Sequence, residues 1–180
     1  MNVNSCRILS CFILLSLAGC VGVAAEGANM TKDQVVYKKY LDAAKDGDAK
    51  AEYKVGDALC CSIGDRQGFY DTRQSVAWLC RASRQGYALA SRKLGQIYAG
   101  DTVHGLRLLR RIAEGVAGHR TDLPVSYAWY RVAAAQGSKD ASTDATTLWD
   151  DFDNDQKARA RTLLSDVTHL PCRWDEVFKK

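Results

Sequence analysis

Apolar side chains recur three or four positions apart through most of the chain, which is the spacing of one face of an α-helix. The pattern begins beside Thr31 and Gln34, which have the spacing of a capping box. Gly47 can then take the left-handed conformation that ends a helix. The periodicity predicts helices near residues 32–45, 49–62, 72–85, 88–99, 123–136, 139–150 and 155–167.

Aspartates mark the expected starts of three of these helices. Asp48, Asp71 and Asp122 each precede a helical run, where a carboxylate can accept hydrogen bonds from the free amides of the first turn. Pro124 falls in a first turn, where proline is tolerated. Helices this short are not stable alone in water. The sequence therefore predicts an all-α fold whose helices stabilise one another.

One helical stretch occurs twice. Residues 71–86 and 122–137 match at a constant offset of 51, which relates Trp78 to Trp129. A shorter offset of 39 relates Gly56 to Gly95, so the second unit is about 12 residues longer than the first. Self-similarity of this size indicates repeated helix pairs that stack as a solenoid.

Small and large residues alternate in the repeat. Gly56 and Gly95 lie inside expected helices, where glycine is tolerated if a neighbouring backbone comes close. Trp78, Trp129 and Tyr130 would then fill the space between layers. A tryptophan that stacks on a ligand is the alternative, although an aromatic at a helical repeat position is usually part of the core.

The pattern Ala-x-x-x-Leu/Val-Gly, followed by Trp-x-x-x-Ala-small-x-x-Gly on the next helix, resembles the SEL-one-like repeat, a relative of the tetratricopeptide repeat. It covers roughly residues 43–141 and is clearest at 90–98. The sequence departs from this pattern at Leu59, which stands where the later unit has Tyr98, and at Leu79–Cys80, which stand where it has Tyr130–Arg131. The resemblance implies an α-α superhelix, a right-handed solenoid of antiparallel helix pairs that binds a partner. The structural repeat residues would be Gly56, Trp78, Gly86, Gly95, Tyr98, Trp129, Tyr130 and Gly137.

The first 19 residues have the features of a secretory signal peptide. Arg7 precedes an apolar run over residues 8–17, which is too short to span a bilayer stably. The sequence 17–20, Leu-Ala-Gly-Cys, is similar to a bacterial lipobox. This resemblance implies a lipoprotein with palmitate-type acyl chains on Cys20, and Val21 after it implies the outer membrane. An ordinary signal peptide with a chance cysteine is the alternative.

The remaining chain suits one domain. Residues 20–30 form a lipidated, flexible tether, and residues 31–168 form the solenoid with a C-terminal capping helix. Residues 169–180 form a tail with enough aromatic surface to dock on the domain. The formal net charge of +4 falls to about +3 without Arg7. This charge is too small to indicate nucleic acid, so we expect membrane contact through the lipid alone.

An insert near residues 101–121 accounts for the greater length of the second unit. It carries Arg107, Arg110 and Arg111 close together. Insertions in repeat proteins map to loops on one face, which is often the binding face. These arginines are therefore the candidate partner-binding residues, and a packed helix with a solvated basic side is an equal alternative.

Four cysteines, Cys60, Cys61, Cys80 and Cys172, remain after the signal peptide and Cys20. In an oxidising compartment they are candidate disulfide cysteines, with three possible pairings. A bond between adjacent cysteines would be strained, so we favour Cys60 or Cys61 paired with Cys80 on the adjacent helix. Cys-x-x-Cys is absent, which argues against a thioredoxin-like role.

The sequence contains no recognisable catalytic or metal motif. His104, His119 and His169 have no cysteine or carboxylate at a metal-ligand spacing. The acidic run 150–155 lacks the glycine and glutamate of an EF-hand and is better explained by helix caps in a solvated turn. We therefore expect no cofactor and no enzyme, but a lipid-anchored envelope adaptor for an unidentified protein or peptide. An envelope hydrolase or thiol-redox enzyme on the same scaffold is the alternative.

Overall fold

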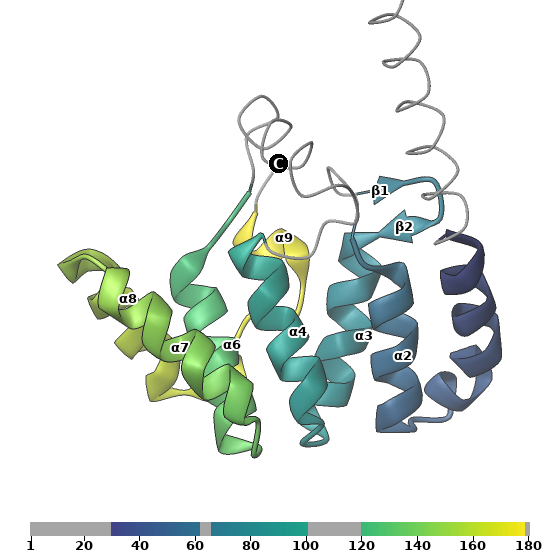
Figure 1. Cartoon of the computed structure of the whole chain (residues 1–180), viewed down its shortest axis with the longest axis horizontal. Helices are drawn as coiled ribbons and strands as arrows, with labels where there is room; N and C mark the ends of the chain where they lie inside the picture. The colour runs from purple at the N-terminus through teal and green to yellow at the C-terminus, as the bar shows by residue number, and fades with distance from the viewer. Residues whose placement is uncertain (1–29, 62–65, 101–119, 179–180) are drawn as a thin grey trace, which may run out of the picture.

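The computed structural model describes residues 30–61, 66–100 and 120–178, and this part of the chain is mostly helical (Figure 1). The predicted all-α class is confirmed at this level. After a first helix over residues 30–45 come α2 (Ala49–Leu59), α3 (Thr72–Arg84), α4 (Ala88–Ala99), α6 (Leu123–Ala135), α7 (Lys139–Asp151), α8 (Asn154–Ser165), a 3₁₀ turn (Val167–His169) and α9 (Trp174–Val177).

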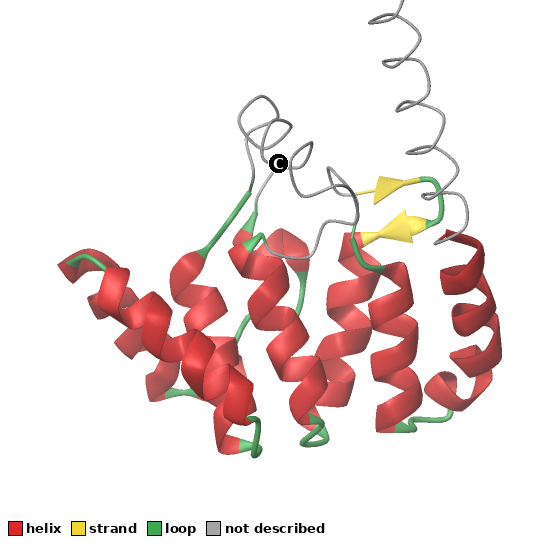
Figure 2. Ribbon diagram, viewed as in Figure 1, coloured by secondary structure: helices red, strands yellow, loops and turns green. Residues whose placement is uncertain are grey.

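A short hairpin connects α2 to α3 and was not predicted. Strand β1 (Arg66–Gln67) pairs antiparallel with β2 (Tyr70–Asp71). Gly68, in the turn, has a φ of 58°, a conformation that favours glycine. Figure 2 shows the hairpin in yellow beside the ends of the helices.

The three predicted aspartate caps are present. The carboxylates of Asp48, Asp71 and Asp122 accept hydrogen bonds from amides three residues later, at 2.7, 3.0 and 3.1 Å. Two predicted boundaries are wrong. Residue 30 is already helical, so Thr31 is not the N-cap, and α2 ends at Leu59 because the backbone at Cys60 is extended.

Most helices adjacent along the chain pack against one another. α2 contacts α3, α3 contacts α4, α4 contacts α6, and α6 contacts both α7 and α8. Figure 1 shows these helices arranged in a row, with α2, α4 and α7 towards the viewer. The core therefore runs along the row between successive helices.

The two predicted glycines lie at close helix contacts. A Cβ on Gly56 would lie 2.7 Å from Cγ of Leu79, and a Cβ on Gly95 would lie 2.5 Å from the Tyr130 ring. Both distances are shorter than a carbon–carbon contact allows. Glycine thus lets α2 approach α3 and α4 approach α6 in the same way.

A buried serine makes the same hydrogen bond at both contacts. Ser75 Oγ donates to the Gly56 carbonyl oxygen at 2.7 Å, and Ser126 Oγ donates to the Gly95 carbonyl oxygen at 2.7 Å. The serines are 51 residues apart and the glycines 39, as in the sequence repeat. The helix pairs α2–α3 and α4–α6 are therefore joined by equivalent residues.

Two of the three predicted interlayer aromatics are fully buried. Trp129 is 3% exposed and Tyr130 is 3% exposed, each in a separate cluster of apolar residues. Trp78 is half-buried against the cluster of the first helix and α2, and the Arg81 guanidinium lies 4.5 Å from its ring centroid. The equivalent repeat positions thus differ in burial.

The favoured disulfide pairing was wrong. Cys60 is bonded to Cys61, and Cys80 is bonded to Cys172, with the latter two Cα atoms 5.5 Å apart. Cys80 faces the C-terminal tail, whose position the repeat pattern does not specify. Cys172 of the tail is therefore the disulfide partner of Cys80, in place of the predicted cysteine at the end of α2.

Candidate functional site

Several predicted site residues lie outside the described part of the chain. These are the lipidation candidate Cys20, the basic cluster Arg107, Arg110 and Arg111, and two histidines, His104 and His119. The candidate site is therefore built from the surfaces of the described helices.

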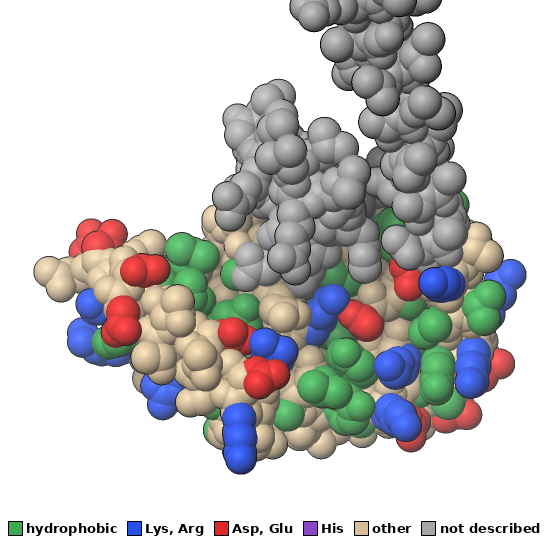
Figure 3. Space-filling view, viewed as in Figure 1, with side chains coloured by type: hydrophobic (Ala, Val, Ile, Leu, Met, Phe, Trp, Pro, Cys, Tyr) green, Lys and Arg blue, Asp and Glu red, His purple; other side chains and the backbone are tan. Residues whose placement is uncertain are grey.

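A continuous surface crosses α2, α4 and α7, which belong to successive helix pairs. We call it the α2–α4–α7 surface and define it by Tyr53, Asp57, Tyr87, Leu89, Arg92, Lys93, Asp140 and Asp144. Figure 3 shows this side of the molecule, where basic and acidic side chains adjoin near the middle, among apolar groups.

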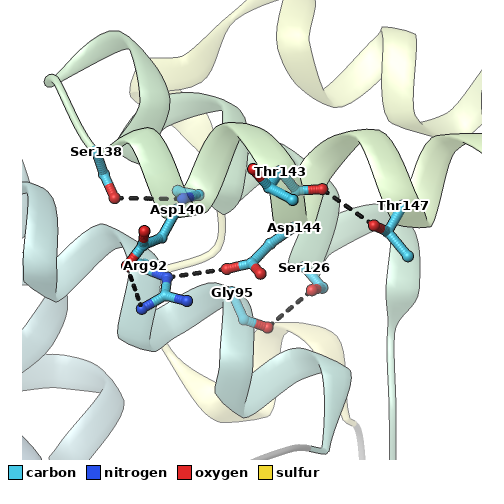
Figure 4. A network of polar contacts seen from close by, with 9 residues as sticks. Arg92, Gly95, Ser126, Ser138, Asp140, Thr143, Asp144 and Thr147 are labelled. Atoms are coloured by element: carbon cyan, nitrogen blue, oxygen red, sulfur yellow. Dashed lines mark hydrogen bonds and ion pairs between the residues drawn. The ribbon is translucent and has the colours of Figure 1, made fainter.

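Ion pairs join the three helices across this surface. Lys93 Nζ lies 2.7 Å from an Asp57 carboxylate oxygen and thus connects α4 to α2. Arg92 Nε donates to Asp144 at 2.9 Å, and an Nη of Arg92 lies 3.4 Å from Asp140 (Figure 4). Both contacts of Arg92 connect α4 to α7. The charges are thus held in fixed positions on the surface.

The guanidinium of Arg92 is held by two carboxylates of α7. The hydrogen bond with Asp144 raises the pKa of Arg92 above its ordinary value, against the opposing effect of partial burial. Charge-assisted hydrogen bonds of this kind are stronger than neutral ones. Arg92 therefore stays charged and oriented while about a quarter of its side chain, 28%, remains open to solvent.

An aromatic and apolar patch lies beside the ion pairs. The rings of Tyr53 and Tyr87 are 5.3 Å apart, and Leu89 is 51% exposed. Burial, and then the charge of Asp57, raises the pKa of Tyr53 to about 12. The phenol is thus neutral at physiological pH. Tyrosine and arginine are both enriched at protein interfaces.

The C-terminal tail docks on the domain, as its aromatic composition predicted. Leu170 and Trp174 belong to the same buried cluster as Tyr98 and Trp129. Trp174 stacks on Tyr98 with ring centroids 5.7 Å apart. Tyr98, a predicted structural repeat residue, thus also contacts the tail.

The acidic and histidine candidates have structural partners. Asp153 accepts from the Gln156 amide at 2.8 Å and begins α8, in line with the predicted cap. His169 is exposed and lies 2.7 Å from Asp166. Hydrogen bonds from Thr168, and then from His169, lower the pKa of Asp166.

The described residues include neither a metal-binding cluster nor a membrane-spanning helix. Within residues 30–61, 66–100 and 120–178, no group of three or more histidine, cysteine, aspartate or glutamate side chains could hold a metal ion. In the same ranges, no helix combines the length and the apolar composition needed to cross a bilayer.

Comparison with known proteins adds no family. No protein-family model matches the chain, and a search of curated proteins gives no match.

Proposed function

We propose that this protein is a lipid-anchored adaptor of the bacterial cell envelope that binds a protein or peptide through a helical repeat surface. In this proposal the helices form a right-handed solenoid of SEL-one-like repeats. Acyl chains on Cys20 hold the domain at the outer membrane, facing the periplasm. The partner is another envelope protein or a peptide segment of one.

One observation carries the proposal. The equivalent Ser75–Gly56 and Ser126–Gly95 hydrogen bonds join α3 to α2 and α6 to α4 in the same way, and ion pairs then join α2, α4 and α7 into one surface. A surface that crosses several helices suits an extended partner, since each helix adds contacts along its length. Its tyrosine pair and Arg92 are of the residue types that are enriched at protein interfaces.

Photo-crosslinking in cells tests this proposal. A photoreactive phenylalanine analogue at Leu89 should capture a partner as a discrete heavier band. The same analogue at Val167 is a matched control. The two apolar residues are similarly exposed, at 51% and 47%, and only Leu89 belongs to the α2–α4–α7 surface.

The lipid anchor has a test of its own. Cys20→Ser should abolish labelling with a fatty-acid analogue and leave the precursor unprocessed.

Each part of the test can contradict the proposal separately. Equal capture at Leu89 and Val167, or no capture at Leu89 in anchored protein, would rule out the α2–α4–α7 surface as the binding site. A Cys20→Ser protein that is still labelled and processed normally would rule out the lipid anchor.

A further inference from the structure

The C-terminal segment, residues 170–178, covers a face of the helical domain made by α3, α4 and α6. We call this the α3–α4–α6 face, and it includes Val76, Cys80, Leu94, Tyr98 and Trp129. Leu170 and Trp174 are 3% and 7% exposed and belong to the same buried cluster. The segment thus lies on the domain in the way that a bound peptide would.

Aromatic contacts hold the middle of the segment. Trp174 stacks on Tyr98 at an interplanar angle of 20°, and Phe178 lies 4.4 Å from Trp174 between ring centroids. Phe178 also approaches Tyr98, with ring centroids 6.1 Å apart. Stacked rings of this kind contribute beyond the area that they bury. The face therefore favours an aromatic side chain at the position of Trp174.

A charge contact adds a second preference. An Nη of Arg73 on α3 lies 3.3 Å from the carboxylate of Asp175, the residue after the tryptophan. A cation beside an aromatic site selects a segment that carries a carboxylate next to its aromatic residue, since electrostatic complementarity governs specificity. The chemistry of the bound segment is thus aromatic followed by acidic.

The segment also carries its own local hydrogen bonds. Glu176 accepts from the backbone amides of Cys172 and Arg173 at 3.0 and 3.2 Å. The Phe178 amide donates to the Trp174 carbonyl oxygen at 3.0 Å. These bonds close within the segment, so leaving the face does not remove their partners.

Two hydrogen-bond donors beneath the segment are unused. The Tyr98 hydroxyl and Trp129 Nε1 are buried and have no hydrogen-bond partner in the part of the chain that the structure describes. Burial, and then the charges of Glu176 and Asp122, raises the pKa of Tyr98, so its phenol remains a neutral donor. A buried donor without an acceptor is costly. A ligand that supplied acceptors would therefore bind this face better than the present segment does.

We propose that residues 170–178 are an intramolecular ligand, and that the α3–α4–α6 face binds a partner segment with an aromatic residue followed by carboxylates. The Cys80–Cys172 disulfide keeps the segment seated. A dithiol releases it by thiol–disulfide exchange, in which the two cysteines gain two electrons and two protons and the dithiol becomes a disulfide. This inference goes beyond the proposed adaptor function and does not use the α2–α4–α7 surface.

A peptide-binding experiment on the full chain tests the proposal. The probe is a fluorescent peptide with the sequence of residues 170–178, in which serine replaces the cysteine. The chain with Cys80→Ala, Cys172→Ala and Trp174→Ala, the open variant, should bind it with a Kd at least ten-fold lower than the oxidised wild type. A peptide with alanine in place of its tryptophan, or lysine in place of its aspartate, should bind the open variant at least ten-fold more weakly.

Reduction of the wild type provides a second measurement. Dithiothreitol should raise the rate of amide hydrogen exchange in residues 170–178, while the amides of α3 and α4 stay protected from exchange. The same change in a Cys60→Ala/Cys61→Ala chain would assign the effect to Cys80–Cys172. Unchanged exchange on reduction, or an open variant that keeps its helical content and does not bind the peptide, would overturn the proposal. An open variant that loses its helical content would also overturn it, because the segment would then be core.

Discussion

Gly56 and Gly95 determine how closely the two helices of a pair approach, α2 and α3 in one pair and α4 and α6 in the other. Each lies in the middle of a helix and faces a buried side chain of the next helix, Leu79 in one pair and Tyr130 in the other. The space that a β-carbon would need is already occupied. These positions therefore need glycine for its small size, whereas Gly47, Gly86 and Gly137 have positive φ angles at the turns.

Replacing Gly95 by alanine should destabilise the protein, although alanine favours helix. The helical gain is roughly 0.5–1 kcal/mol, and overpacking a filled core costs about 1–3 kcal/mol. We expect the overpacking to dominate, because the tyrosine ring is rigid and buried. Urea unfolding followed by circular dichroism would measure the loss of stability, with Lys50→Ala, at an exposed position of α2, as a control near zero. An unchanged or higher midpoint for Gly95→Ala would contradict the close contact.

At the scale of helices, local sequence signals were enough to predict most boundaries. The predicted helix 88–99 matches α4, and 72–85 and 123–136 exceed α3 and α6 by one residue each. These signals are local, because an aspartate cap acts within one turn and an apolar face repeats within two. The repeat offset also predicted which glycines would make close contacts.

Features that depend on distant residues were not predicted. The tail carries aromatic residues but no signal for its partner, so the Cys80–Cys172 bond and the Trp174–Tyr98 stack were missed. Arg92 and Asp144 are 52 residues apart, and their contact requires α4 to meet α7. The sequence could find the helices that carry the candidate site, but not which of their charges pair.

Trp129 allows a test of whether α6 is held by its buried face. Truncating a buried tryptophan typically costs about 3–5 kcal/mol, so Trp129→Ala should lower the melting temperature strongly or prevent folding. Trp149→Ala on α7 is a matched control, because that side chain is only partly buried, and it should cost less. If Trp129→Ala has the melting temperature of the wild type but no longer binds a partner protein, Trp129 is a partner-binding residue and not part of the core.

At the scale of the whole molecule, the two disulfides constrain the chain differently. Cys60–Cys61 joins neighbouring residues and closes no loop. Cys80–Cys172 joins residues 92 positions apart and ties the tail to α3. A crosslink stabilises a fold mainly by restricting the unfolded chain, and more so for a longer loop. The second disulfide should therefore carry most of the stabilisation that the cysteines provide.

Paired alanine substitutions would separate these two contributions. Cys80→Ala/Cys172→Ala should lower the free energy of unfolding by about 2–4 kcal/mol, the usual range for a native disulfide that closes a long loop. Cys60→Ala/Cys61→Ala removes two buried sulfur atoms without opening a loop, whereas the other pair has one buried and one partly buried cysteine, so it should lower that free energy by less. Urea unfolding of the oxidised proteins would give both values. Equal losses from the two variants would mean that side-chain packing, and not chain restriction, accounts for the stabilisation by Cys80–Cys172.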